Sequence, residues 1–383
     1  MDSYAAAPAT LPAGRAFAPG ELVLHAGRGE RSLDDALAEA DLLVATPHAG
    51  SALPAELEPF LAPGFAASDR LRLDFTDVAT RAVTRRWAEI DPRVVLVENP
   101  HPRLVRDPNR PRPNDLRPQL AGAFARIRAA ADAGTPVDLA GVDAVRPVTF
   151  AGLPVLAPPA DEAGLARLAE TLREVGTRGV DVYERTRDDL FDRLVAKKLR
   201  GATLRSGACF FLSFHDTMNA TTAPDGAIAG ERERAARMPG VLALSNRGDP
   251  QGQARGREPV TFWPALLRRL ADAHRTAFDA PAAGDVVLNR PFVGGSEVTR
   301  FGAACRELTE GMTEPGFVFG AVQAEFRREY LLGEPAAAHL ATPGTDWPEP
   351  DPERVDAVAH RLRAAWDAFR DALAPAPRQL HRL

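Results

Sequence analysis

Apolar runs alternate with segments of helical periodicity along most of the chain. Short runs rich in Val, Leu and Phe are typical of buried strands, and they occur at residues 42–50, 93–99, 207–216, 285–292 and 317–326. Other segments return apolar side chains to one face every three or four residues, which predicts amphipathic helices at 77–90, 119–133, 161–176, 180–199, 262–278 and 355–373. This alternation favours an α/β fold whose mostly parallel sheet is covered on both faces.

The domain organisation follows from length and from local composition. A chain of 383 residues allows two ordinary domains, and one large α/β domain fits as well. The first 20 residues are rich in Ala and Pro, which predicts a loosely held N-terminal arm before a domain over residues 21–383. Residues 101–118 are dense in Pro and Arg, so we expect a long irregular loop there, of the kind that often carries function.

Composition narrows the class of protein. Apolar residues make up 45% and charged residues 26%, as in soluble globular chains, and the net charge of −5 argues against a general nucleic-acid binder. Cys209 and Cys305 are the only cysteines, so neither a disulfide framework nor a four-cysteine zinc module can form. The N-terminal residues lack a signal-peptide pattern and no run reaches 18 apolar residues, so we expect a cytoplasmic protein with no membrane association.

Polar clusters follow the predicted strands, at the end of the sheet where open α/β folds bind ligands. His48 comes directly after the first strand, where it is either a ligand or a capping or core histidine. His215 ends the most apolar strand, and strand alternation places it on one face with Ser213 and Thr217 while Asp216 points to the other. A charged pair at the end of so apolar a strand indicates a functional role as readily as packing.

Acidic residues recur at two further places. Asp74 and Asp77 precede the helix at 77–90, where capping is the simpler role because a carboxylate accepts unpaired backbone N–H groups. Glu325 shares a strand face with Gln323 and Arg327, which suits either a proton shuttle or an ion pair on an edge strand.

Two histidines and a carboxylate from separate regions, without cysteine, are the usual ligands of a catalytic zinc ion that keeps a position for water. A glutamate near such a water serves as general base. Arg110 and Arg300 lie beside turn-forming residues, and a guanidinium binds a carboxylate through two parallel hydrogen bonds. With only two lysines among 47 basic residues, 45 are arginines, so each arginine alone is weak evidence.

The order of these motifs resembles that of the N-formylglutamate amidohydrolase family, zinc hydrolases related in fold to the zinc carboxypeptidases and aspartoacylase. The similarity runs from Leu42 to Leu332 through the motifs PHAGSALP, TDVATRAV, RDPNRP, FLSFHDTM, NRPFVGGSEVTRFG and QAEFRREYL. It implies one catalytic domain, a three-layer α/β/α sandwich of the phosphorylase/hydrolase-like type with a mixed, mostly parallel sheet. Residues 112–180 match poorly, and we expect them to form an insertion that shapes the pocket.

Carried over residue by residue, the resemblance implies one zinc ion per chain held by His48, Asp77 and His215, with Glu325 as the base. It also implies substrate contacts from Asn109, Arg110, Arg300 and Arg328. The expected substrate is a small acidic N-acyl amino acid, with N-formyl-L-glutamate first. Two alternatives stay open: the substrate is another acidic or pathway-specific amide, or the protein is a metal-free binding protein on the same fold. The sequence does not determine the oligomeric state.

The chain departs from the family pattern at several positions. Ser213 stands where the family has an Asp two residues before the second His, and a carboxylate there would orient the imidazole. Asp216 replaces a small Ser and is a candidate to compensate, although strand alternation directs it elsewhere. Asp74 stays an alternative ligand one helical turn from Asp77. The His-x-x-Glu pair of carboxypeptidases is absent, because Ser51 stands three residues after His48.

Overall fold

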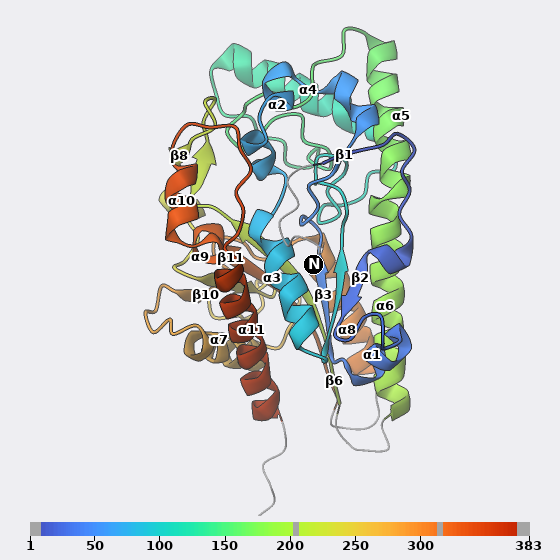
Figure 1. The fold of residues 1–383 in the computed structure, drawn as a ribbon, viewed down its shortest axis with the longest axis vertical. Coiled ribbons are helices and arrows are strands. Elements are labelled where there is room, and N and C mark those ends of the chain that lie inside the picture. Colours follow the sequence, from blue (N-terminus) through green and yellow to red (C-terminus); the bar gives the residue numbers. More distant parts are fainter. Residues whose placement is uncertain (1–8, 202–206, 312–316, 374–383) are drawn as a thin grey trace, which may run out of the picture.

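The computed structural model describes residues 9–201, 207–311 and 317–373, which fold around a seven-stranded sheet with the order β10-β9-β11-β6-β3-β5-β2 (Figure 1). The strands are β2 (Val23–His25), β3 (Leu42–Thr46), β5 (Val94–Glu98), β6 (Gly207–Thr217), β9 (Leu242–Ser245), β10 (Val286–Leu288) and β11 (Phe317–Arg327). β2 pairs antiparallel with β5 and β9 pairs antiparallel with β11, while the other four pairings are parallel. The predicted mixed, mostly parallel sheet is therefore confirmed.

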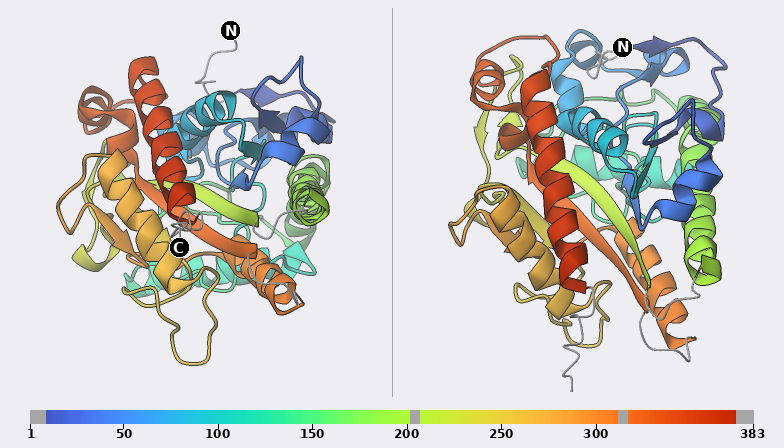
Figure 2. Two further views of the ribbon diagram at one scale, coloured as in Figure 1. Left: turned by 90° about the horizontal axis from the view of Figure 1, so that it is seen from below. Right: turned by 60° about the horizontal axis from the view of Figure 1, so that its bottom comes forward.

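Helices cover both faces of this sheet (Figures 1 and 2). One face packs against α3 (Val78–Ile90), α7 (Pro264–Ala277) and α11 (Pro352–Leu373), and the other against α1 (Leu33–Glu39), α6 (Val180–Gly201) and α8 (Ser296–Glu310). Alternate residues of β3 enter the two separate apolar cores, Leu42 and Val44 on one side and Leu43 and Ala45 on the other. Because both faces are buried, the central strands read as continuous apolar runs in the sequence.

The long elements match their predicted positions, but α8 and several short elements were missed. α8 buries Val298, Phe301 and Cys305, which recur at helical spacing, and Phe301 stacks on Phe211 of β6 with ring centroids 3.9 Å apart. The remaining elements are β1 (Thr10–Leu11), β4 (Leu53–Pro54), β7 (Ala220–Thr222), β8 (Ile228–Glu231), α2 (Pro63–Ala66), α4 (Leu116–Ala133), α5 (Glu162–Arg178), α9 (Arg328–Leu332), α10 (Glu334–Leu340) and four 3-10 turns.

The N-terminal arm expected over residues 1–20 is held in place from residue 9 onward, while residues 1–8 lie outside the described residues. β1 pairs in parallel with β4. The backbone N–H of Phe17 donates to the carbonyl oxygen of Arg178 at 3.0 Å, and the Phe17 ring meets His101 edge-on. These contacts attach the arm to the body of the domain.

Residues 112–180, expected as an insertion, contain α4 and α5, which pack on each other and on the segment before α3 in an apolar cluster of their own. The loop between these helices carries Phe150, which lines a cavity at the ends of β6 and β11. Residues 100–115 form no helix or strand, as their proline content predicts, but Leu116, Arg117 and Pro118 of the expected loop belong to α4. This stretch therefore brings one wall of the cavity to the end of the sheet.

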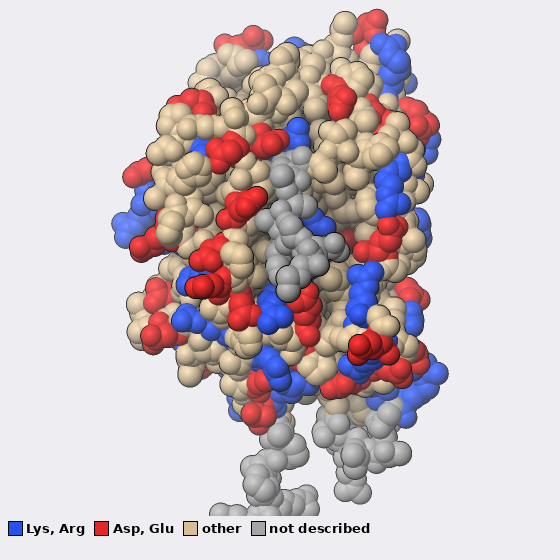
Figure 3. Space-filling model, in the orientation of Figure 1, with Lys and Arg blue, Asp and Glu red and all other residues tan. Residues whose placement is uncertain are grey.

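Among the described residues, every helix is too short or too polar to cross a membrane. On the face shown in Figure 3, acidic and basic side chains are interspersed over the helices. That face consequently presents mixed charge to solvent.

The buried histidine of α7 makes folding stability depend on pH. His274 stacks on Phe278, and its Nδ1–H donates to the carbonyl oxygen of Leu270 at 2.8 Å. Burial lowers the pKa of His274 to about 4, so below pH 6.5 the unfolded chain binds a proton that the folded chain does not. Stability is then lost as the pH falls from about 6.5 towards 4, at about 1.4 kcal/mol per pH unit for this one site.

We expect the free energy of unfolding, measured with urea, to fall less in H274L than in the unsubstituted protein between pH 7 and pH 4.5. The two falls should differ by roughly 2–3 kcal/mol. The control is H360L, at a histidine whose side chain is more than half exposed on α11. Equal pH dependence in H274L and the parent would show that His274 does not stay neutral in the folded state.

Candidate active site

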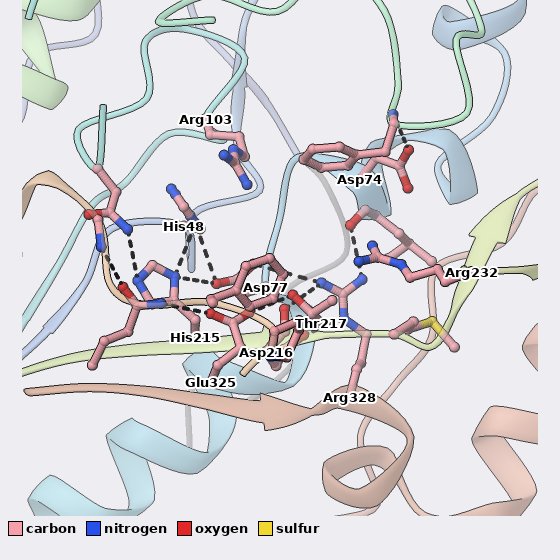
Figure 4. Close-up of a pocket in the computed structure, with 18 of the residues that line it drawn as sticks. His48, Asp74, Asp77, Arg103, His215, Asp216, Thr217, Arg232, Glu325 and Arg328 are labelled. Atoms are coloured by element: carbon pink, nitrogen blue, oxygen red, sulfur yellow. Dashed lines mark hydrogen bonds and ion pairs between the residues drawn. The ribbon is translucent and has the colours of Figure 1, made fainter. Parts of the chain in front are cut away.

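A cavity of about 410 Å³ opens at the carboxyl ends of β3, β6 and β11. Its walls come from the loop after β5, the segment before α3, the β7–β8 hairpin and the loop before α8. Figure 4 shows the side chains that converge in it. The position at the ends of the parallel strands is the one at which α/β sheets bind ligands.

The sequence-predicted metal ligands meet in this cavity. His48 follows β3, Asp77 stands at the N-cap position of α3, and His215 lies near the end of β6. Nδ1 of His215 is 3.0 Å from Oδ2 of Asp77 and 3.1 Å from Nδ1 of His48, and all three residues are buried (Figure 4). The three potential ligand atoms lie within 4.8 Å of one another, so a single cation can contact all of them.

Asp77 is free to face the histidines because another residue caps α3. Its side chain makes no capping hydrogen bond, and Oδ2 of Asp216 on β6 accepts instead from the backbone N–H groups of Ala79 (3.0 Å) and Thr80 (2.8 Å). The prediction that Asp77 caps the helix is therefore wrong. Burial opposes ionisation, but the neighbouring histidines hold the pKa of Asp77 below its usual range, so the carboxylate is charged.

Asp74, the alternative ligand, lies in the cavity wall away from the histidines. It accepts hydrogen bonds from the backbone N–H of Phe150 at 2.8 Å and from the Thr222 hydroxyl at 3.1 Å. Burial raises the pKa of Asp74. Asp74 thus joins the insertion to the β7–β8 hairpin, and it neither caps α3 nor faces His48 and His215.

Each histidine is held through its Nε2 atom and turns Nδ1 towards the centre. Nε2 of His48 contacts Oδ1 of Asp107 at 2.8 Å, and Nε2 of His215 lies 3.0 Å from the Ser213 hydroxyl. Ser213 in turn donates to Oε2 of Glu297 on α8 at 2.7 Å. Asp107, in the RDPNRP motif, and Glu297, in the unpredicted helix α8, were both missed as site residues.

The suggestion that Asp216 compensates for Ser213 is wrong. β6 continues to Thr217, so alternation sends Asp216 to the opposite face of the strand from His215. There Asp216 caps α3 and forms a buried ion pair with Arg328.

Glu325 lies on β11 directly beside His215 in the parallel pairing of β11 with β6. Its carboxylate accepts hydrogen bonds from the Thr217 hydroxyl and from Nε2 of Gln323, the latter at 3.1 Å. Burial raises the pKa of Glu325. Arg327, expected on the same face, pairs with Glu329 at 3.4 Å. The structure therefore places Glu325 in the cavity, held by two neutral donors.

The arginines expected to bind substrate differ in their positions. Arg110 lines the cavity, with its Nε 2.8 Å from Oδ2 of Asp143. Arg300 does not line it: its side chain is 61% exposed and pairs with Asp188 at 2.7 Å. The expectation that Arg300 contacts the substrate is therefore wrong. α8 buries Val298 and Phe301, and this orientation of the helix turns Arg300 outward.

Arg328 lines the cavity, but protein acceptors surround its guanidinium. It pairs with Asp216 and donates to the carbonyl oxygens of Leu73 and Thr76, each at 2.9 Å. These bonds tie the start of α9, directly after β11, to the segment before α3. Arg328 thus fixes the position of the cavity wall, and its hydrogen bonds are made without a ligand.

Arg232 is a cavity arginine that the sequence did not single out. It follows β8 and points towards the same space as Arg328 (Figure 4). Its Nε is buried without a hydrogen-bond partner, and among the described residues no carboxylate forms an ion pair with its guanidinium. Burial lowers the pKa of Arg232, and the charge of Arg328 adds to this effect. Among the described residues, the Nε–H group of Arg232 is therefore left without an acceptor, although the nearby Asp74 carboxylate attracts its guanidinium.

Asn109 lies between the two ends of this network. Its Nδ2 is 3.3 Å from Nε2 of His215, and its Oδ1 accepts from the backbone N–H of Glu297 at 3.2 Å. Asn109 therefore links the loop after β5 to the start of α8 at the edge of the metal-ligand cluster.

Comparison with known proteins gives the family. A search of curated proteins and a search of solved structures returned no match. The sequence model of the N-formylglutamate amidohydrolase family matches residues 40–332, about three-quarters of the chain. The matched range includes His48, Asp77, His215 and Glu325, together with the strands that carry the cavity. The chain therefore belongs to the N-formylglutamate amidohydrolase family.

Proposed function

We propose that the protein is a zinc-dependent amidohydrolase that removes the acyl group from a small acidic N-acyl amino acid, with N-formyl-L-glutamate as the first candidate. In that reaction water and N-formyl-L-glutamate give formate and L-glutamate. The observation that carries the proposal is the convergence of two imidazole nitrogens and one carboxylate oxygen beside Glu325 in the cavity. Membership of the family supports amide hydrolysis of this kind.

The donor set fits zinc. His48, His215 and Asp77 supply two nitrogens and one oxygen, a combination typical of catalytic zinc sites that keep a further position for water. Hydrogen bonds at both Nε2 atoms leave both Nδ1 atoms for a metal. A zinc ion bound there would supply an activated water and polarise the scissile carbonyl.

Glu325 is the group placed to move protons. Its carboxylate lies in the cavity next to His215, and Thr217 and Gln323 fix its position. We assign it the role of base that accepts a proton from the attacking water and returns it to the leaving amine. Its hydrogen-bond donors are neutral, so they hold the carboxylate without adding a formal charge beside it.

Two arginines of the cavity are candidates to bind an acidic substrate. Arg110 and Arg232 both line the cavity, and the Nε–H group of Arg232 has no acceptor among the described residues. A planar guanidinium binds a carboxylate through two parallel hydrogen bonds. We therefore assign Arg232 and Arg110 to the two carboxylates of the substrate, and this replaces the expected pair of Arg110 and Arg300.

We expect R232A to raise KM by about 10-fold or more with a smaller change in kcat, because the lost contact is made in the ground state and in the transition state alike. R300A is the matched control, since Arg300 is exposed outside the cavity, and it should keep the kinetic constants of the parent. A loss of activity in R300A equal to that in R232A would overturn this assignment.

The test of the function is formate and acetate release from a panel of N-formyl and N-acetyl amino acids, with and without a chelator. Release of formate from N-formyl-L-glutamate that stops with the chelator and returns with added zinc supports the proposal. Preference for another acidic amide would keep the reaction class and change the substrate. No release from any substrate, with far less than about one zinc per chain after gentle purification, would favour a metal-free binding protein.

A further inference from the structure

We propose that Glu297, acting through Ser213, is the positioning group that holds His215 in the orientation and tautomer needed for metal binding. The inference rests on the proposed metal site. It concerns the position at which this chain has Ser213 in place of the Asp expected from the family resemblance. In the fold the missing carboxylate is supplied from a different element, the first turn of α8.

The contacts form one continuous chain from α6 to the metal-ligand cluster. On α6, the Tyr183 hydroxyl and Nη1 of Arg187 donate to Oε1 of Glu297 at 2.7 and 2.6 Å. Oε2 of Glu297 accepts from Ser213 at 2.7 Å, and the Ser213 oxygen lies 3.0 Å from Nε2 of His215. Glu297 and Ser213 are fully buried, so water does not compete for these bonds.

The direction of the hydrogen bonds follows from the donor inventory. Glu297 forms a buried ion pair with Arg187, and an anionic carboxylate can only accept. The single hydroxyl proton of Ser213 is therefore used towards Glu297, and the Ser213 oxygen can only accept from His215. This arrangement places a ring proton of His215 on Nε2. Nδ1 faces Asp77 and His48, so a metal ion bound there would replace the proton that Nδ1 can donate to Asp77.

His48 is held in a similar way, but by a carboxylate in direct contact with its ring. Its Nε2 contacts the carboxylate of Asp107 without an intermediate, and its Nδ1 faces the same centre. A carboxylate that accepts the outer ring proton of a metal-binding histidine fixes the ring and raises its basicity as a ligand. Both histidines thus end on a carboxylate, Asp107 directly and Glu297 through one hydroxyl.

Asn109 is the competing neighbour of the same nitrogen. Nδ2 of Asn109 lies 3.3 Å from Nε2 of His215 and can donate to it only if Nε2 is unprotonated. In that case the neutral ring of His215 would carry its proton on Nδ1 instead. The contact with Ser213 is shorter and connects to a charged group. The two possibilities predict opposite effects of substitution at Ser213 and Asn109.

The test measures Zn²⁺ affinity by competition with a chromophoric chelator, which requires no turnover. We expect S213A to bind Zn²⁺ about 10–100-fold more weakly than the parent, the usual cost of losing such an outer partner. S213A leaves the pair of Glu297 and Arg187 intact, so it keeps the buried charge partnered. S245A is the matched control, because Ser245 is also a buried strand serine that donates one hydrogen bond, here to the carbonyl oxygen of Phe292.

A second pair of variants tests the direction of the chain. In E297Q the amide can donate to Ser213, which then donates to Nε2 of His215 and drives the ring proton to Nδ1, so Zn²⁺ affinity should fall as in S213A. In S213D/E297Q a carboxylate stands next to His215 again, and affinity should recover towards that of the parent. ¹⁵N NMR of the zinc-bound parent should show a protonated Nε2 on His215.

The outcomes separate this inference from the proposed function. A parent protein that binds no Zn²⁺ would overturn the metal site itself. A parent that binds Zn²⁺ while S213A binds it equally well, or while only N109A weakens it, would overturn the role of Glu297 and Ser213 alone. A failure of S213D/E297Q to exceed E297Q would also count against it, provided that both variants are folded by circular dichroism.

Discussion

E325Q is expected to lose turnover by about 10²–10⁴-fold while it keeps the metal content of the parent, because general base catalysis contributes that range. The substituted amide would still accept a hydrogen bond from Thr217 and keep the volume of the side chain. It would have no lone pair basic enough to take a proton from water at neutral pH. The measurement is kcat for formate release, alongside zinc per chain by elemental analysis.

The matched control for this substitution is E329Q, four residues further along. Glu329 lies on α9 outside the cavity, where it accepts a hydrogen bond from the backbone N–H of Asn219 at 2.8 Å. The E329Q variant should keep both the zinc content and the kcat of the parent. An E325Q protein with kcat near that of the parent would remove Glu325 as the base and leave the metal ligands untouched.

The sequence predicted the parts of the fold that depend on local pattern. β3, β6 and β11 are buried on both faces, so each is a continuous apolar run that stands out from its neighbours. Because parallel strands end at one edge of a sheet, polar residues that follow such runs were expected to meet. The pattern therefore predicts that His48 and His215 lie at the same edge of the sheet, although they are 167 positions apart.

What the sequence could not supply is the partner of each side chain. Arg328 contacts the carbonyl oxygen of Leu73, 255 positions away, and no local pattern marks a backbone acceptor in another element. Asp77 matched a helix cap in sequence, yet the cap comes from Asp216 on β6, because that strand end abuts the start of α3. Tertiary contact decides both cases.

The error at α8 has a clearer origin. The residues before Arg300 are turn-forming, and that pattern hides the helical spacing of Val298, Phe301 and Cys305. Recognition of that helix would have turned Arg300 to solvent and Glu297 to the interior. Glu297 would then have been a buried acid in need of partners, which is the signal that a site residue gives.

H215A is expected to lose both metal and turnover, in contrast to E325Q. Removal of a ligand leaves His48 and Asp77 as the two remaining donors of the cluster, so the loss in Zn²⁺ affinity should exceed the roughly 10–100-fold that follows loss of an outer partner. Without a metal ion the site would lack the group proposed to polarise the carbonyl and to activate water, and Glu325 would have no activated water to deprotonate. Zinc per chain and kcat should therefore fall together.

Chelation of the parent protein separates loss of the metal from damage to the fold. The chelated parent should match H215A in activity, and added Zn²⁺ should restore the parent but not H215A at the same concentration. H360A, at an exposed histidine of α11, is the control for a histidine substitution outside the cavity. Full zinc content in H215A would show that the ion binds elsewhere. The cluster of His48, Asp77 and His215 would then be a hydrogen-bonded part of the core, and Glu325 would have no role as a base beside a metal ion.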